Sequence, residues 1–169
     1  MNTIHLIRAA AASLLLIAGS ALAQDCQVAG GGVFEDLGAY DDGSGSCRDR
    51  ARFSGSIVAA FDGVRCDSFN PEGEWELTLS DGRVFQADHF DYLTFRVDGI
   101  DIATAGGTGV FDGHAVEFVM QFEGEAGRRG SDVDFIVVVA TYSEPPLLGN
   151  PAFDSRGWVQ GGTASLVPD

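Results

Sequence analysis

The histidines that have carboxylate neighbours are the side chains of this sequence best suited to proton transfer. His89 lies between Asp88 and Asp91, and a histidine beside an orienting carboxylate can act as a general base. Neighbouring residues of a strand point to opposite faces, so Asp88 is not expected to share a site with His89. If the chain is an enzyme, the candidate catalytic residues are His89, His114 and Asp91. No sequence pattern brings His114 to His89, and surface or turn histidines are the favoured alternative.

Metal binding is the second chemistry that the residue types allow. Four carboxylates lie close together in the sequence around one expected hairpin: Glu123, Glu125, Asp132 and Asp134. Calcium takes several oxygen ligands from a loop, so this cluster is the best candidate metal site and calcium the candidate cofactor. The spacing matches no calcium-loop motif, and Arg128 and Arg129 can pair with the same acids. A solvated acidic turn is the alternative.

Carbohydrate binding needs exposed aromatic side chains on a sheet face or a loop. The available residues are Tyr40, Tyr92, Tyr142 and Trp158. Trp158 is the strongest candidate because it follows a long proline-containing segment over residues 143–156. Core burial explains Trp75 and most of the 12 phenylalanines better.

The three cysteines predict one disulfide. Cys26 is expected just before the first strand and Cys66 just after the second, which places them at the same end of an antiparallel pair. Cys47 lies before the second strand, so a Cys47–Cys66 bridge would need that strand to bend. We therefore expect Cys26 and Cys66 to pair, with Cys47 free or paired between molecules.

The first 23 residues have the parts of a cleavable secretory signal peptide. Arg8 precedes an apolar run over residues 9–18, and Ala21-Leu22-Ala23 matches the pattern that signal peptidase accepts. The run is shorter than the roughly 20 residues that span a bilayer. We expect residues 1–23 to be removed and residues 24–169 to form one secreted domain. That domain would lie in the periplasm or outside the cell, with no membrane span after processing.

The charge of the chain narrows the class of partner. The formal net charge is −15, all ten basic residues are arginines, and removal of Arg8 makes the charge more negative. Nucleic-acid binding is disfavoured because neutralising phosphates needs a basic face. The expected partner is an extracellular protein or a carbohydrate, and the acidity itself is typical of a soluble exported protein.

The elements that must position these residues are strands. Apolar residues alternate with polar ones, and turn dipeptides such as Asp81-Gly82 and Asp112-Gly113 separate the runs. Residues 135–140 are continuously apolar, as expected for a strand buried on both faces. The pattern predicts an all-β fold, an antiparallel β-sandwich or partly closed barrel of about eight or nine strands. The expected strands cover residues 28–34, 50–61, 74–79, 84–87, 92–97, 116–122, 135–140 and 158–166.

The order of motifs in the C-terminal half resembles the post-COAP domain of secreted bacterial surface proteins. The matching motifs are Gly107-Thr108-Gly109, Asp112-Gly113, the strand end over residues 121–127, the strand start over residues 132–138, and Gly161-Gly162-Thr163-Ala164. The N-terminal half fits through Gly30-Gly31-Gly32 and Arg52-Phe53-Ser54-Gly55. Ala126 stands where the family pattern has proline. The resemblance implies an extracellular β-sandwich-like module, and it implies no catalytic residues because the family has no assigned activity.

Taken together, these patterns favour a secreted interaction or structural module without catalytic activity. The alternatives are a small extracellular enzyme with a histidine acid or base, and a calcium-dependent or carbohydrate-binding module. No Gly-x-Ser-x-Gly elbow supports nucleophilic hydrolysis. An enzyme predicts His89 in a concave pocket beside a carboxylate, whereas a binding module predicts an exposed aromatic or acidic patch.

Overall fold

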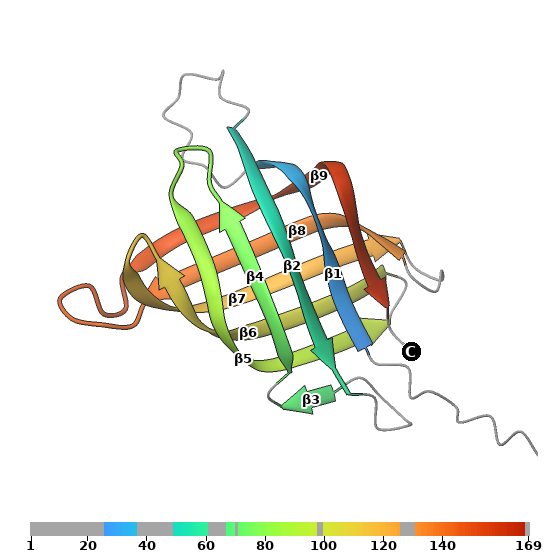
Figure 1. Cartoon of the computed structure of the whole chain (residues 1–169), viewed down its shortest axis with the longest axis horizontal. Helices are drawn as coiled ribbons and strands as arrows, with labels where there is room; N and C mark the ends of the chain where they lie inside the picture. Colours follow the sequence, from blue (N-terminus) through green and yellow to red (C-terminus); the bar gives the residue numbers. More distant parts are fainter. Residues whose placement is uncertain are drawn as a thin grey trace, which may run out of the picture.

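A computed structural model describes residues 26–36, 49–60, 67–69, 71–97, 100–125 and 131–167, and every regular element within these ranges is a β-strand. Figure 1 shows the strands wound around a common axis, with those of the near wall crossing those of the far wall. The strands are β1 (Cys26–Asp36), β2 (Asp49–Ala59), β3 (Asp67–Phe69), β4 (Glu72–Thr78), β5 (Val84–Val97), β6 (Ile100–Phe111), β7 (His114–Glu125), β8 (Ser131–Tyr142) and β9 (Pro151–Val167).

The strands close into a barrel in chain order. Each of β1, β2, β4, β5, β6, β7, β8 and β9 pairs antiparallel with the next in this series, and β9 pairs with β1. The short β3 pairs with residues 92–94 of β5, beyond the end of β4. The all-β fold expected from the sequence is confirmed, and the ring is fully closed. Closure pairs both edges of the main sheet, which would otherwise be open to further strands.

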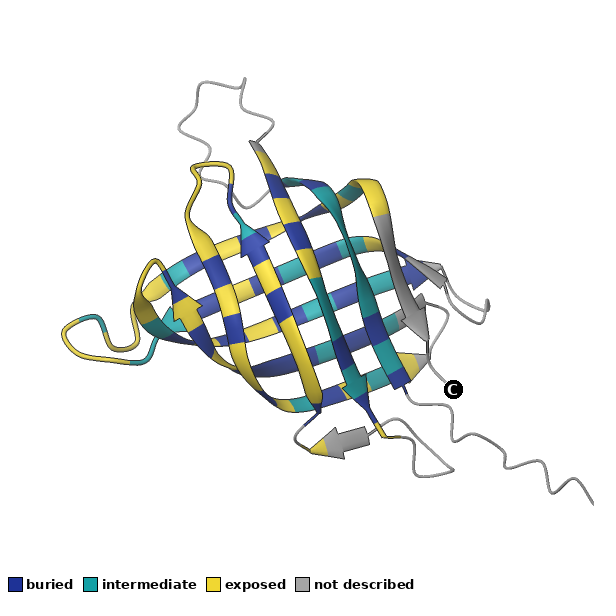
Figure 2. Cartoon of the chain, in the orientation of Figure 1, coloured by how far each residue is buried: buried dark blue, intermediate teal, exposed yellow. Residues whose placement is uncertain are grey.

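The barrel interior is a packed core. Alternate residues of each strand point inward, which gives the banding of buried and exposed positions in Figure 2. The indole of Trp75 stacks on Phe53 with ring centroids 5.7 Å apart, and its edge contacts Phe122 at 4.9 Å. An eight-stranded barrel is just wide enough for side chains to fill it. The largest fully buried side chains are Trp75, Phe34, Phe85, Phe90, Phe111, Phe122, Ile57, Leu77, Leu93, Met120 and Ile136.

Four strands differ from the expected pattern: β3 and β6 cover residues that were not expected to form strands, and β5 and β9 have other bounds than expected. Residues 84–87 and 92–97 form one strand, β5, whose pairing with β6 is interrupted by register shifts between Ala87 and His89 and between Phe90 and Tyr92. The strand β9 begins at Pro151, so it includes the second part of the segment expected to be a loop. Extra residues at bulges let a long strand follow the curvature of the barrel wall.

The expectation that residues 135–140 are buried on both faces is wrong. Ile136, Val138 and Ala140 are buried inside the barrel, but Val139 on the other face is 39% exposed. Phe135 and Val137 on that outer face are only partly buried. The barrel is one layer of sheet thick, so the outer face of a strand meets solvent even where its sequence is apolar.

The pairing of β1 with β9 closes the ring through glycines. Gly32 lies opposite Gly162, which has a φ of 99°, in the left-handed region that glycine adopts most readily. A Cβ on either residue would overlap the backbone of the facing strand. The two strands can therefore approach closely only where both lack side chains.

A buried polar contact also joins β1 to β9. Asp36 is the last residue of β1 and is buried. The buried hydroxyl of Ser155 donates a hydrogen bond to its Oδ2 at 2.8 Å, and the backbone N–H of Arg156 donates to Oδ1 at 3.2 Å. Buried polar groups are stable when they are hydrogen-bonded in this way.

Cys26 is buried at the start of β1 and is disulfide-bonded. Cys47 and Cys66 both lie outside the described residues. The pairing of Cys26 with Cys66 therefore stays a prediction.

Candidate functional site

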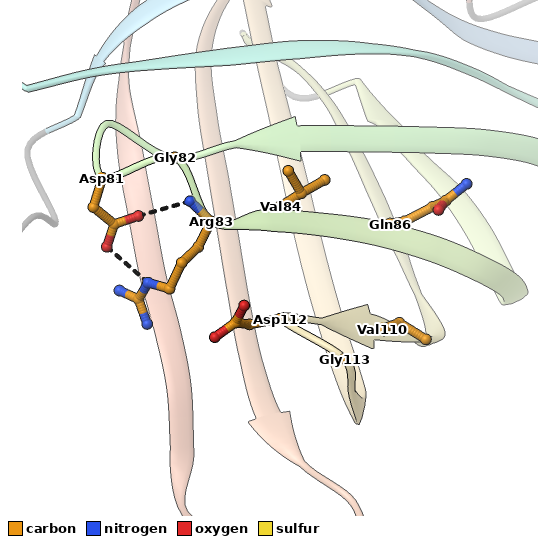
Figure 3. Close-up of a pocket in the computed structure, with 8 residues that line it drawn as sticks. All are labelled: Asp81, Gly82, Arg83, Val84, Gln86, Val110, Asp112 and Gly113. Atoms are coloured by element: carbon orange, nitrogen blue, oxygen red, sulfur yellow. Dashed lines mark hydrogen bonds and ion pairs between the residues drawn. The ribbon is translucent and has the colours of Figure 1, made fainter.

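A cleft of about 420 Å³ lies on the outer surface, beside the turn that joins β4 to β5. Figure 3 shows the residues that line it. Asp81 accepts hydrogen bonds from the backbone N–H of Arg83 at 3.0 Å and from its Nε at 2.7 Å. The backbone hydrogen bond from Arg83 is the main cause that lowers the pKa of Asp81 below its usual value. The guanidinium of Arg83 also lies 4.9 Å from the ring centroid of Phe111. Asp81 and Arg83 therefore satisfy each other, and their contacts hold the turn.

The structure brings two of the candidate catalytic residues together. Nε2 of His89 lies 3.5 Å from Oδ1 of Asp91 on the outer wall of β5, and both side chains are more than half exposed. The expectation that Asp88 and His89 point to opposite faces is wrong, because the bulge after Ala87 leaves both residues exposed. An ion pair this exposed contributes little free energy.

His114 lies elsewhere. It begins β7, and its ring contacts Tyr142 edge-to-face with centroids 5.8 Å apart. His114 is exposed, and among the described residues its partner is this tyrosine and not His89. The structure therefore gives the two histidines separate surroundings.

The candidate calcium ligands are described only in part. Oε1 of Glu123 accepts a hydrogen bond from Nε2 of Gln121 at 2.6 Å, and Asp134 is exposed on β8. The side chains of Glu125 and Asp132 lie outside the described residues. Within the described part of the chain no three potential ligands gather into a metal site. Calcium binding by the full cluster stays a prediction.

Trp158 lies on the outer wall of the barrel. It is 56% exposed, and its ring contacts Phe135 of the neighbouring strand edge-to-face at 4.9 Å. A half-exposed tryptophan held against a second aromatic ring is a ready contact for a ligand or partner, because it presents a large apolar area at little cost in conformational entropy.

Trp158 is one end of a larger apolar surface, which we call the outer strip. Its members are Val119 on β7, Phe135, Val137 and Val139 on β8, and Trp158 on β9. Val119 pairs directly with Val139, and Phe135 pairs with Trp158. Phe135, Val137 and Val139 alternate along β8 and so share one face. The strip therefore crosses three neighbouring strands without a break.

A groove of about 320 Å³ continues the outer strip toward β5. Val119 and Val139 form part of its lining, and Tyr92, Asp91 and Glu117 add one aromatic ring and two carboxylates. The ring of Tyr92 lies over Gly106, where a Cβ would overlap it. The groove thus joins the apolar strip to an acidic margin.

Sequence reasoning found Trp158 but missed the rest of the outer strip. The signal that was available is apolar residues at outward positions, such as Val119 between the inward-facing Phe118 and Met120. A continuous apolar run such as residues 135–140 predicts burial on both faces, so the outward positions of Phe135, Val137 and Val139 did not stand out.

Searches of protein-family models, curated proteins and solved structures find no match to this chain. Within the described residues no helix is long and apolar enough to cross a membrane. The function must therefore be argued from the surface itself.

Proposed function

We propose that the protein is a secreted, non-catalytic interaction module that docks a protein partner on the outer strip. The observation that supports this most directly is the exposure of Val119, Val139 and Trp158, at 48%, 39% and 56%, on one continuous wall. The interior is occupied by packed aromatic side chains, so a ligand held inside the barrel is not favoured. Contiguous apolar patches with a polar margin are typical of protein interaction sites.

The charges around the outer strip indicate the chemistry of the partner. Glu117 and Glu123 lie on β7 beside it, and Asp134 lies on β8. The nearby cation Arg156 is paired with Asp154. The margin is therefore acidic, and a partner with an apolar centre and a basic rim would be complementary to it. The strongly negative charge of the whole chain would speed the approach of such a partner.

The proposal can be tested with short synthetic peptides in which leucine alternates with lysine or with glutamate. An extended peptide of this kind presents its leucines on one face and its charges on the other. The chain has two tryptophans, and Trp75 is buried, so a blue shift and reduced acrylamide quenching on binding would report on Trp158. We expect the lysine peptide to bind and the glutamate peptide not to bind.

The matched variants are two pairs of exposed strand valines. Val119→Ser with Val139→Ser removes apolar area from the outer strip, and Val84→Ser with Val110→Ser removes similar area elsewhere, from residues 40% and 36% exposed. The strip variant should weaken binding about tenfold or more, since each buried valine contributes about 1.5 kcal/mol. Equal loss in both variants, or protection of Trp158 by neutral oligosaccharides alone, would refute a protein-docking strip.

A further inference from the structure

Two arginines on the wall formed by β1, β2 and β4 make no ion pair with any described residue, although acids outnumber bases by 25 to 10 in the sequence. They are Arg50 and Arg52, which are exposed on the outer face of β2. The other described arginines have partners: Arg83 pairs with Asp81, Arg156 pairs with Asp154, and Arg96 also makes an interaction. Among the arginines that the structure describes, this pair is therefore the exception.

The two guanidinium groups are held on the same side of the wall. Residues two apart on a strand point the same way with their Cα atoms about 7 Å apart, so Arg50 and Arg52 add their positive charges at one place. The cross-strand neighbour of Arg50 is Glu35, which makes an interaction of its own. Two positive charges therefore lie close together on a protein that is negative overall.

A cleft of about 380 Å³ lies at these arginines. Its lining combines the two arginines with the hydroxyl-bearing residues Thr78 and Ser80, the apolar Val33, and Leu79 and Gly82. Thr78 and Val33 are the direct cross-strand neighbours of Arg52 on either side. Paired donors, hydroxyls and an aliphatic surface thus meet within one shallow cleft.

We propose that this arginine cleft binds a sugar acid, in which a carboxylate is carried on a polyhydroxylated ring. Guanidinium groups bind carboxylates through two parallel hydrogen bonds, which explains a need for arginine at this place. Thr78 and Ser80 can exchange hydrogen bonds with ring hydroxyls, and Val33 can contact the C–H groups of the ring. A volume in the range of small-molecule sites is larger than a lone inorganic anion needs.

The proposal is independent of the outer strip. The arginine cleft is lined by residues of β1, β2, β4 and the turn after β4, whereas the strip lies on β7, β8 and β9. Figure 1 shows β2 and β4 on the near wall and β7 and β8 on the far wall. Loss of one binding activity should leave the other unchanged, so each can fail alone.

The test is calorimetric or NMR titration of the protein with digalacturonate, with neutral galactobiose and with acetate. We expect digalacturonate to bind at least tenfold more tightly than either control, and binding to weaken as salt is added because the contacts are charged. Arg50→Gln and Arg52→Gln should each reduce the affinity for digalacturonate tenfold or more.

Arg156→Gln is the matched control, because it removes the same charge from a residue already paired with Asp154. It should change the affinity less than twofold. Equal binding of galactobiose, equal binding of acetate, no binding of digalacturonate at millimolar concentration, or an equal effect of all three arginine variants would overturn the proposal.

Discussion

The two walls of the barrel are alike on their inner faces and differ in the chemistry of their outer faces. On the inside, both contribute alternating apolar side chains to one core. On the outside, β2 and β4 present charged and hydroxyl side chains around the arginine cleft, whereas β7, β8 and β9 present the outer strip. Both walls contribute apolar side chains to the core, so core packing does not explain why their outer faces differ. The difference marks where binding should be sought.

The largest expected effect separates the two tryptophans. Trp75→Ala should cost about 3–5 kcal/mol of unfolding free energy, because it empties the centre of the core. Trp158→Ala should change stability by less than about 1 kcal/mol while it weakens binding of the leucine–lysine peptide. Urea denaturation followed by circular dichroism measures the first effect, and peptide titration followed by calorimetry measures the second. Similar losses of stability in both variants would contradict the division into core and docking surface.

Trp75→Phe refines this prediction. The indole Nε1 of Trp75 is buried and has no hydrogen-bond partner among the described residues. Phenylalanine removes that unpaired donor, so it should cost markedly less stability than alanine does. If both substitutions cost the same, the indole nitrogen is satisfied by a group such as a buried water.

A smaller effect concerns how closely the strands of the near wall pack. Gly55 lies opposite Trp75, and a Cβ there would overlap the indole and the backbone of β4. Gly55→Ala should therefore cost about 1–3 kcal/mol through overpacking. Gly161→Ala is the control, since a Cβ there meets no atom within 4 Å. Thermal unfolding of both variants tests this, and an equal shift in midpoint would mean that the wall can relax around an added methyl group.

The buried contact between β1 and β9 should have an effect of similar or smaller size. Ser155→Ala removes the hydroxyl that donates to Asp36, and the carboxylate keeps the backbone N–H of Arg156. We expect a loss of about 1–2 kcal/mol, measurable by urea denaturation. Ser54→Ala, on the exposed face of β2, should have almost no effect.

The smallest effect is a pH dependence at the β4–β5 turn. The folded pKa of Asp81 is lowered, so its contribution to stability is present above the ordinary pKa near 3.8 and is lost as pH falls through the lower folded value. The group is half exposed, so this contribution is well below about 1 kcal/mol. Arg83→Gln should raise the pKa of Asp81 only in part, because the backbone hydrogen bond remains. An NMR titration of the Asp81 carboxyl would show this, and a return to the ordinary value would contradict it.

The sequence predicted the strands well where alternation is regular. Trp75 and Leu77 on β4, Leu79 just after it, and alternate residues of β7 from Val116 to Phe122 are buried as expected. It failed where a bulge changes which face a residue occupies, as at Asp88 and His89, because bulges depend on the curvature of the closed ring. It also failed on β8, because apolar residues on a strand do not reveal whether a second layer covers them.

The outer strip and the arginine cleft could not be predicted for a related reason. Both are formed across strands, and their residues come together only through pairings such as Val119 with Val139 or Arg52 with Thr78. Those pairings are fixed by the register of the barrel, which the turn signals suggest but do not determine.

The glycine pairing of β1 with β9 has a consequence for how the barrel assembles and opens. Every other pair in the ring joins strands that are close in sequence, whereas this one joins the two ends of the described chain, from Gln27 to Val167. Its formation must overcome the largest loss of chain entropy, so it should form last in folding. Few side chains hold it along the glycine stretch, so the backbone amides there should exchange with solvent before those of the core strands. The β1–β9 pairing is therefore the one that closes the barrel, and we expect the barrel to open there first.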